Sequence, residues 1–136
     1  MSAITAELPP DLNELVAQAR GVRERAYAPY SRFLVGAAVR AENGQVFTGC
    51  NVENASYGAT ICAERSAILA MVAAGQRSII GIAVFTDADT LAMPCGLCRQ
   101  VISEFQHDAR LVVANPRQQR VLAFFEIFPE PFVLDR

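Results

Sequence analysis

Two short apolar segments separated by a helix-like segment dominate the second half of this 136-residue chain. Residues 78–87 (SIIGIAVFTD) and 110–116 (RLVVANP) are apolar and short, as buried strands are. Residues 94–105 (PCGLCRQVISEF) carry apolar side chains at helical spacing, and this pattern predicts that Leu97 faces inward. A strand–helix–strand unit predicts two parallel strands joined by a crossover helix. The chain is therefore expected to form a layered α/β fold.

The first half adds a helix, a hairpin and a second helix. The expected elements are a helix over 11–27, strands over 33–41 and 46–52, and a helix over 61–74. Asp11 is the expected N-cap of the first helix, and Asn43-Gly44 is a typical hairpin turn. Because a hairpin pairs its strands antiparallel, the sheet is expected to be mixed.

Length and composition predict one globular domain over residues 1–136. Hydrophobic residues make up 52% and charged residues 19%, which excludes a disordered chain. The sequence contains no apolar run of about 18 residues, so no membrane span is predicted. Residues 1–10 show no secretory signal and are expected to be flexible. We therefore expect a cytoplasmic protein without a membrane partner. The net charge of −2, with no long basic block, argues against a nucleic-acid polymer as partner.

Three of the four cysteines stand where helices are expected to begin. Cys62 precedes one helix, and Cys95 and Cys98 form a Pro-Cys-x-x-Cys at the start of the other. A helix N-terminus favours the thiolate over the thiol. If both helices start at the same sheet edge, three thiolates meet and leave one coordination position open. That arrangement is typical of catalytic zinc rather than structural zinc.

Glu64 and Arg65 follow the first cysteine at once. Two residues from a ligand, the Glu64 carboxylate can lie near the metal without binding it, where it can transfer protons. Arg65 can donate hydrogen bonds to the thiolates and offset their negative charge.

Two other kinds of protein share part of this pattern. A Cys-x-x-Cys alone fits a zinc-stabilised binding module without turnover, and it also fits a thiol–disulfide oxidoreductase built on Cys95 and Cys98. Glu64 favours catalysis, because a purely structural site would not require that carboxylate. Bound zinc would count against the redox alternative, because the thiolates would be occupied.

Three blocks of the sequence resemble the small, homotetrameric, three-cysteine cytidine deaminases. The blocks are AYAPYSRFLVGAAV (26–39), NVENASYGATICAERSA (51–67) and PCGLCRQVISEF (94–105), and the resemblance covers roughly residues 11–115. It implies a three-layer α/β/α sandwich around a mixed five-stranded sheet. It also implies one zinc ion per subunit and hydrolysis of cytidine and deoxycytidine to uridine and deoxyuridine plus ammonia, in pyrimidine salvage.

The resemblance implies a role for each matching residue. Cys62, Cys95 and Cys98 match the zinc ligands, and Glu64 matches the group that moves protons between the attacking water, the pyrimidine N3 and the leaving amine. Arg65 is expected to donate hydrogen bonds to the thiolates without binding the zinc itself.

Five further positions match groups that hold the nucleoside. Asn51 and Glu53 match residues that bind the ribose 3′-hydroxyl, and Phe33 matches an aromatic ring beside the nucleoside. The Ala63 N–H matches a donor to the pyrimidine O2. Phe132 matches a C-terminal phenylalanine that reaches a neighbouring subunit's site.

The chain departs from the family pattern at three places. Leu34 stands where many members have proline, Leu97 stands where a smaller residue is usual, and the tail AFFEIFPEPF (123–132) is shorter and more apolar. Blasticidin-type deaminases share the cysteine and glutamate motifs, so an aminated nucleoside such as blasticidin S is the alternative substrate. The intact NVENASYG favours a ribosyl pyrimidine.

Overall fold

The computed structural model describes residues 3–5 and 7–135. The helices are α1 (Pro10–Arg23), α2 (Ala63–Ala73) and α3 (Gly96–Phe105), with short 3-10 turns η1 (Tyr57–Ala59) and η2 (Phe124–Glu126). The strands are β1 (Ala3–Thr5), β2 (Gly36–Ala41), β3 (Val46–Cys50), β4 (Ile79–Phe85), β5 (Gln106–Ala114) and β6 (Gln119–Ala123). No helix within the described ranges is long and apolar enough to cross a membrane.

The strands form one mixed sheet in the order β1-β6-β5-β4-β2-β3. β4 and β5 pair in parallel, and the other neighbouring pairs are antiparallel. The predicted mixed five-stranded sheet is confirmed for β2 to β6, and three-residue β1 extends it at one edge. That strand lies within the segment expected to be flexible; residues 1, 2 and 6 of the segment are outside the described residues.

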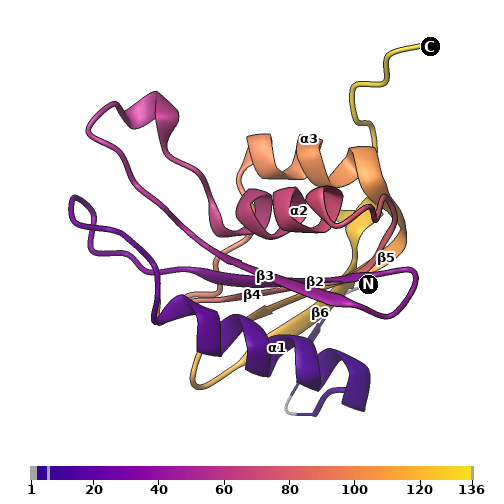
Figure 1. Ribbon diagram of the computed structural model, residues 1–136. Coiled ribbons are helices and arrows are strands. Elements are labelled where there is room, and N and C mark those ends of the chain that lie inside the picture. The colour runs from indigo at the N-terminus through magenta and orange to yellow at the C-terminus, as the bar shows by residue number, and fades with distance from the viewer. Residues whose placement is uncertain (1–2, 6, 136) are drawn as a thin grey trace.

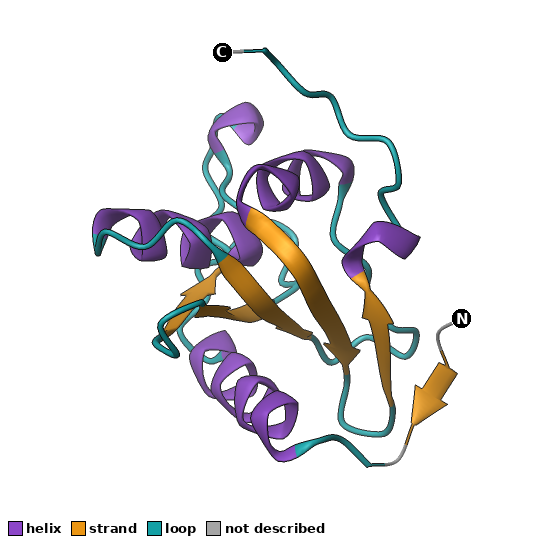
Figure 2. Ribbon diagram, turned by 90° about the vertical axis from the view of Figure 1, so that its right-hand side faces the viewer, coloured by secondary structure: helices purple, strands orange, loops and turns teal. Residues whose placement is uncertain are grey.

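Helices cover both faces of the sheet, which confirms the α/β/α sandwich (Figures 1 and 2). Strand residues alternate between the two faces, as pleating requires. On β2, Ala37 and Val39 belong to the hydrophobic core under α2 and α3, whereas Ala38 packs with Leu12 and Leu15 of α1. The two cores together hold the sheet between its helical layers.

Sheet direction explains why two helices begin close together. β2 is antiparallel to both of its neighbours, so β3 and β4 run in the same direction and end at the same edge. The chain enters α2 after β3 and α3 after β4. Both helix N-termini consequently lie beyond that edge, on the left of Figure 1.

α2 lies unusually close to the sheet at Gly49 on β3. A Cβ atom on Gly49 would stand 2.3 Å from the Ala67 backbone nitrogen and 2.7 Å from the Ala63 carbonyl oxygen. No side chain fits at this distance, so the glycine permits the approach. The close contact fixes the height of the first turn of α2 above the sheet.

The structure corrects three local expectations. Leu97 is 67% exposed, because Cys98 and Ile102 form the buried face of α3. Asp11 lies in the first turn of α1, and Pro9 is the N-cap residue. The apolar segment after residue 118 forms β6, a strand that the residue pattern did not predict.

Candidate metal centre and substrate cavity

Cys62, Cys95 and Cys98 meet at the N-termini of α2 and α3. Their sulfur atoms all lie within 4.8 Å of one another, and the Cys62 and Cys95 sulfurs are 4.0 Å apart. Cys62 and Cys95 are the N-cap residues of their helices, so backbone N–H groups of both first turns face the cluster. The predicted convergence of three thiols is confirmed.

The ionisation of these thiols suits a cation. The pKa of Cys62 falls to about 5, first because Cys98 donates a hydrogen bond to it and also because the Arg65 guanidinium stabilises the thiolate. The pKa of Cys98 rises, because its proton is held by Cys62 and because burial disfavours a second negative charge. A divalent cation would offset that repulsion and allow all three thiolates to form. Three clustered thiols of this kind fit tetrahedral Zn²⁺ with one position left for a non-protein ligand.

Arg65 and Glu64, which follow Cys62 in the sequence, differ in what they do at this cluster. Arg65 donates from its Nη2 to the Cys62 sulfur at 3.4 Å and to the Thr60 carbonyl at 3.3 Å. Glu64 is only 5% exposed, and burial raises the pKa of its carboxyl to about 7, with repulsion from Cys62 adding to the effect. A carboxyl that changes protonation near neutral pH can both accept and return a proton.

A cavity of about 220 Å³ opens beside the cluster. Its lining includes Cys62, Ala63, Glu64 and Cys95. Its lining also includes Ser31, Phe33, Val35, Asn51, Glu53, Thr60, Val84, Thr86, Ala92 and Met93. The structure thus brings the expected substrate contacts Phe33, Asn51, Glu53 and Ala63 into one cavity with Glu64.

The Asn51 side chain is buried and holds one wall of the cavity. Its Oδ1 accepts from the Val35 N–H at 2.8 Å, and its Nδ2 donates to the Phe33 carbonyl at 2.8 Å. A primary amide has two N–H donors and an oxygen with two lone pairs. One donor and one acceptor site of Asn51 therefore remain for a ligand.

The Glu53 carboxylate is oriented by the loop before β2. It accepts from the Tyr30 N–H at 2.9 Å, from the Ser31 N–H at 3.1 Å and from the Ser31 hydroxyl. These donors, the hydroxyl first, hold the pKa of Glu53 below its usual 4.5. Three of about four acceptor positions are used, which leaves one for a hydroxyl group of a ligand.

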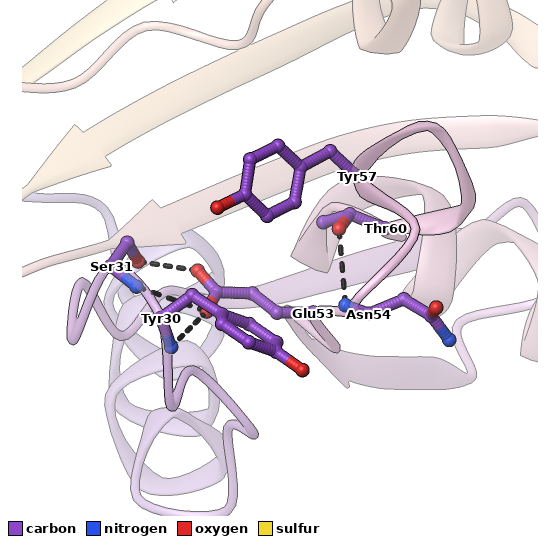
Figure 3. A pocket seen from close by; sticks show the side chains of 6 residues that line it. All are labelled: Tyr30, Ser31, Glu53, Asn54, Tyr57 and Thr60. Atoms are coloured by element: carbon purple, nitrogen blue, oxygen red, sulfur yellow. Dashed lines mark hydrogen bonds between the residues drawn. The ribbon is translucent and has the colours of Figure 1, made fainter.

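A second, outer cavity of about 410 Å³ adjoins the first through Ser31, Glu53 and Thr60. Figure 3 shows the Glu53 carboxylate pointing toward Ser31, with Tyr30 and Tyr57 nearby. The two tyrosine rings meet edge to face, with centroids 6.1 Å apart. Among the described residues that line these two cavities, the carboxylic acids are Glu53 and Glu64, Cys62 is a further anionic group, and none is basic.

Phe132 lies outside both cavities. It is 71% exposed, and its backbone pairs with the Gln100 side chain on α3 through hydrogen bonds of 3.0 and 3.3 Å. Its neighbours Val133 and Leu134 are also exposed. The structure therefore does not bring Phe132 to its own chain's site, and the expectation that it serves another subunit stays a prediction.

Several cavity residues were not singled out from the sequence. Ser31 lies inside the block 26–39, so its position was recognised but its bond to Glu53 was not. Met93 and Ala92 precede Pro94 in a loop without regular structure, where no periodic pattern marks a residue as lining a site.

Comparisons with known proteins agree with this geometry. The model of the family described as the cytidine and deoxycytidylate deaminase zinc-binding region matches residues 10–115. A cytidine deaminase from Sporosarcina psychrophila is 50% identical over 95 residues, which cover 70% of each chain. One from Mycobacterium tuberculosis is 41% identical over 125 residues, which cover 92% of each.

Solved structures give the same result. The crystal structure of a cytidine deaminase from Burkholderia pseudomallei superposes with a TM-score of 0.84 at 44% identity, covering 88% of this chain and 98% of that one. A structure from Mycobacterium tuberculosis gives 0.80 at 39% identity, covering 93% and 100%. With the three-thiol cluster and the matched region spanning most of its length, the chain belongs to the family of zinc-binding cytidine and deoxycytidylate deaminases.

Proposed function

We propose that this protein hydrolyses cytidine and deoxycytidine to uridine and deoxyuridine with release of ammonia. One observation carries the proposal: a buried carboxyl group, Glu64, lines a cavity of about 220 Å³ beside three clustered thiols. A structural metal site has no need of such a group. The names of the relatives support the same reaction.

Cys62, Cys95 and Cys98 are the residues that would hold zinc. When bound, zinc supplies a water molecule that is acidic enough to act as a nucleophile near neutral pH. Glu64 is placed to take one proton from the attacking water and deliver it to N3 of the pyrimidine ring, so that the water oxygen can bond to C4. It would then pass the second water proton to the amine as the C4–N bond breaks and ammonia leaves. Its raised pKa suits both transfers.

The remaining cavity residues orient the nucleoside. The free acceptor position of Glu53 and the free N–H of Asn51 suit the ribose 3′-hydroxyl. The Ala63 N–H, in the first turn of α2, suits the pyrimidine O2, because helix N-terminal N–H groups have no acceptor within the helix. Phe33, which is 42% exposed, provides an apolar surface beside the sugar and base. Arg65 keeps Cys62 in its thiolate form.

The charge of the cavities favours a free nucleoside over a phosphorylated one. Binding of a phosphate group in proteins usually uses basic side chains or helix N-termini. The cavity walls that extend away from the cysteines carry the Glu53 carboxylate, which would repel a 5′-phosphate. The same argument opposes a polynucleotide substrate. Blasticidin S remains the alternative, since the cysteines and Glu64 would serve that substrate equally well.

The cellular setting extends the proposal. Free thiols at Cys62, Cys95 and Cys98 suit a reducing compartment, which supports a cytoplasmic enzyme of pyrimidine salvage. Exposed apolar side chains at Phe125, Phe132, Val133 and Leu134 support burial against other copies of the chain, in the homotetramer that the family resemblance implies. Light scattering of the purified protein tests this assembly directly.

The first experiment measures the ultraviolet spectrum of cytidine over time with purified, zinc-containing protein. We expect a steady conversion to the uridine spectrum. Parallel reactions with deoxycytidine, deoxycytidine monophosphate and blasticidin S rank the substrates. Conversion of the monophosphate faster than the nucleosides would overturn the charge argument, and no conversion of any compound by folded, zinc-loaded protein would overturn the proposed reaction.

A further inference from the structure

Two chain segments from different parts of the sequence each form a wall of the substrate cavity. One is the segment 33–35 before β2, which lines the cavity through Phe33 and Val35. The other is the loop 86–94 between β4 and α3, which lines it through Thr86, Ala92 and Met93. Neither segment contains a helix or strand, and the two leave neighbouring strands side by side, because Gly36 of β2 pairs with Phe85 of β4.

Arg23 contacts both segments at once. Its Nε donates to the Leu34 carbonyl at 3.2 Å, and its Nη2 lies 2.5 Å from the Asp87 carboxylate. Leu34 stands between the two lining residues of the first segment, and Asp87 follows Thr86 in the second. The Arg23 side chain is only 14% exposed, whereas the Asp87 side chain is 56% exposed.

The fold delivers Arg23 to this position through a close helix–strand contact. Arg23 is the last residue of α1, on the sheet face opposite α2 and α3. At Gly36, a Cβ atom would stand 1.9 Å from the Ala19 carbonyl oxygen and 2.9 Å from the Arg23 Cβ. The last turn of α1 is therefore pressed against the start of β2, which limits where the Arg23 guanidinium can lie.

A basic residue in the last turn of a helix usually needs no explanation beyond the helix dipole. Arg23 differs because its planar guanidinium contacts acceptors in both cavity-lining segments, at Leu34 and at Asp87. A rigid fork of this kind fixes the distance between its acceptors, which a single ammonium cannot do.

We propose that Arg23 is a positioning residue that sets the separation of the two walls of the substrate cavity. The expected change in enzyme kinetics rests on the function proposed above. The structural coupling of the two walls by Arg23 does not depend on that function. The metal site is held separately: Arg99 of α3 donates to the Pro94 carbonyl at 2.8 Å, next to Cys95. Loss of Arg23 should therefore disturb substrate binding far more than zinc binding.

Arg23→Met tests this, because methionine keeps much of the apolar stem and loses the polar contacts to Leu34 and Asp87, together with the exposed pair with Glu24. We expect KM for cytidine to rise roughly tenfold while kcat changes by less than about threefold. Zinc content should stay at the wild-type value. The KM of Arg23→Lys should lie between the values of the wild type and Arg23→Met, because one ammonium keeps the charge but cannot span both walls.

Arg117→Met is the matched control. Arg117 pairs with Asp89 of the same loop at 2.8 Å, but this pair is exposed and does not reach the other wall. The Arg117→Met variant should therefore have the wild-type KM for cytidine. A KM for Arg23→Met within about twofold of wild type, or an equal rise in Arg117→Met, would overturn the proposal.

Hydrogen exchange provides a readout that does not depend on turnover. In Arg23→Met, amides of both 33–35 and 86–94 should exchange faster than in wild type, whereas Arg117→Met should affect only the second segment. If the wild-type protein does not convert cytidine, the proposed function fails while this exchange result still decides the role of Arg23. If Arg23→Met does not fold, Asp87→Asn breaks one arm alone and should raise KM roughly threefold; an unchanged KM would then overturn the proposal.

Discussion

The inner and outer parts of the site are built by different means. The inner part, Cys62, Glu64, Cys95 and Cys98, stands at the starts of two helices that pack on the sheet, and Glu64 and Cys98 are buried. The outer part, Tyr30, Ser31, Glu53, Tyr57 and Thr60, lies in loops and the short turn η1, where Tyr30 and Ser31 donate hydrogen bonds to Glu53. Groups that must be placed accurately for proton transfer and metal binding are thus on rigid elements, and groups that recognise the substrate are on loops. If this division is correct, changes in the inner part should remove turnover, and changes in the outer part should weaken binding.

The largest effect is expected from Cys98→Ser. Cys98 is fully buried between the other two thiols, and a serine hydroxyl ionises too weakly to replace a thiolate ligand. The variant should lose its zinc and its activity together, as metal analysis and the ultraviolet assay would measure. Cys50→Ser is the matched control, since Cys50 lies outside the cluster and its loss should leave zinc content unchanged. Retention of zinc by Cys98→Ser would contradict the ligand assignment.

Glu64→Gln should separate metal binding from catalysis. The amide has nearly the same shape but cannot accept or return a proton. We expect wild-type zinc content and a kcat lower by roughly 10²–10⁴-fold, the usual scale for a positioned acid–base group. Near-normal turnover would remove Glu64 from the mechanism and would leave the inner part as a metal site alone.

Gly49→Ala tests whether the inner part depends on the close approach of α2 to β3. The new methyl group would overlap the Ala67 nitrogen and the Ala63 carbonyl, which are backbone atoms and cannot rotate away. We expect the free energy of unfolding to fall by about 1–3 kcal/mol, as measured by denaturant titration.

Gly21→Ala is the control for this change, because a Cβ at Gly21 on α1 would meet nothing within 4 Å. It should stabilise the protein slightly, since alanine favours a helix over glycine. Equal stability of the two variants would mean that α2 can shift away from the sheet at little cost.

Of these variants, Glu53→Gln is expected to have the smallest effect, and the effect should be on substrate binding. Loss of the charged acceptor should raise KM for cytidine roughly tenfold with little change in kcat.

The same variant should change how stability depends on pH. Because the folded-state pKa of Glu53 lies below its usual 4.5, its ionised form stabilises the folded protein above about pH 4.5, and this contribution disappears as pH falls through the lowered pKa. The difference in unfolding midpoint between wild type and variant should therefore shrink on acidification. A difference that is constant with pH would contradict the role of the Ser31 and Tyr30 donors.

The local sequence was sufficient where chemistry depends on short spacing. Cys62, Glu64 and Arg65 lie within one turn, and Cys95 and Cys98 lie within another, so their relative positions follow once each segment is helical. The hairpin turn lies at Asn43-Gly44 as expected for the same reason, because a short hairpin turn depends on the conformations of its own residues, here the positive φ of Gly44. The expected inward position of Leu97 is wrong, because apolar side chains recur at helical spacing on more than one face of α3 and only the sheet below it selects Cys98 and Ile102.

Tertiary structure decided which segments meet. β6 forms from an apolar terminal segment because the edge of β5 is available to pair with it, a fact that its own residues do not contain. Likewise, Arg23 and Asp87 are far apart in the sequence, and no periodic pattern relates them. They meet because close packing at Gly36 brings the end of α1 beside the loop after β4. The sequence by itself determined the reactive groups and their local geometry, since covalent spacing and helix formation act within a few residues. The shape of the cavity around them was decided only by the sheet and its packed helices, since long-range contacts depend on the whole fold.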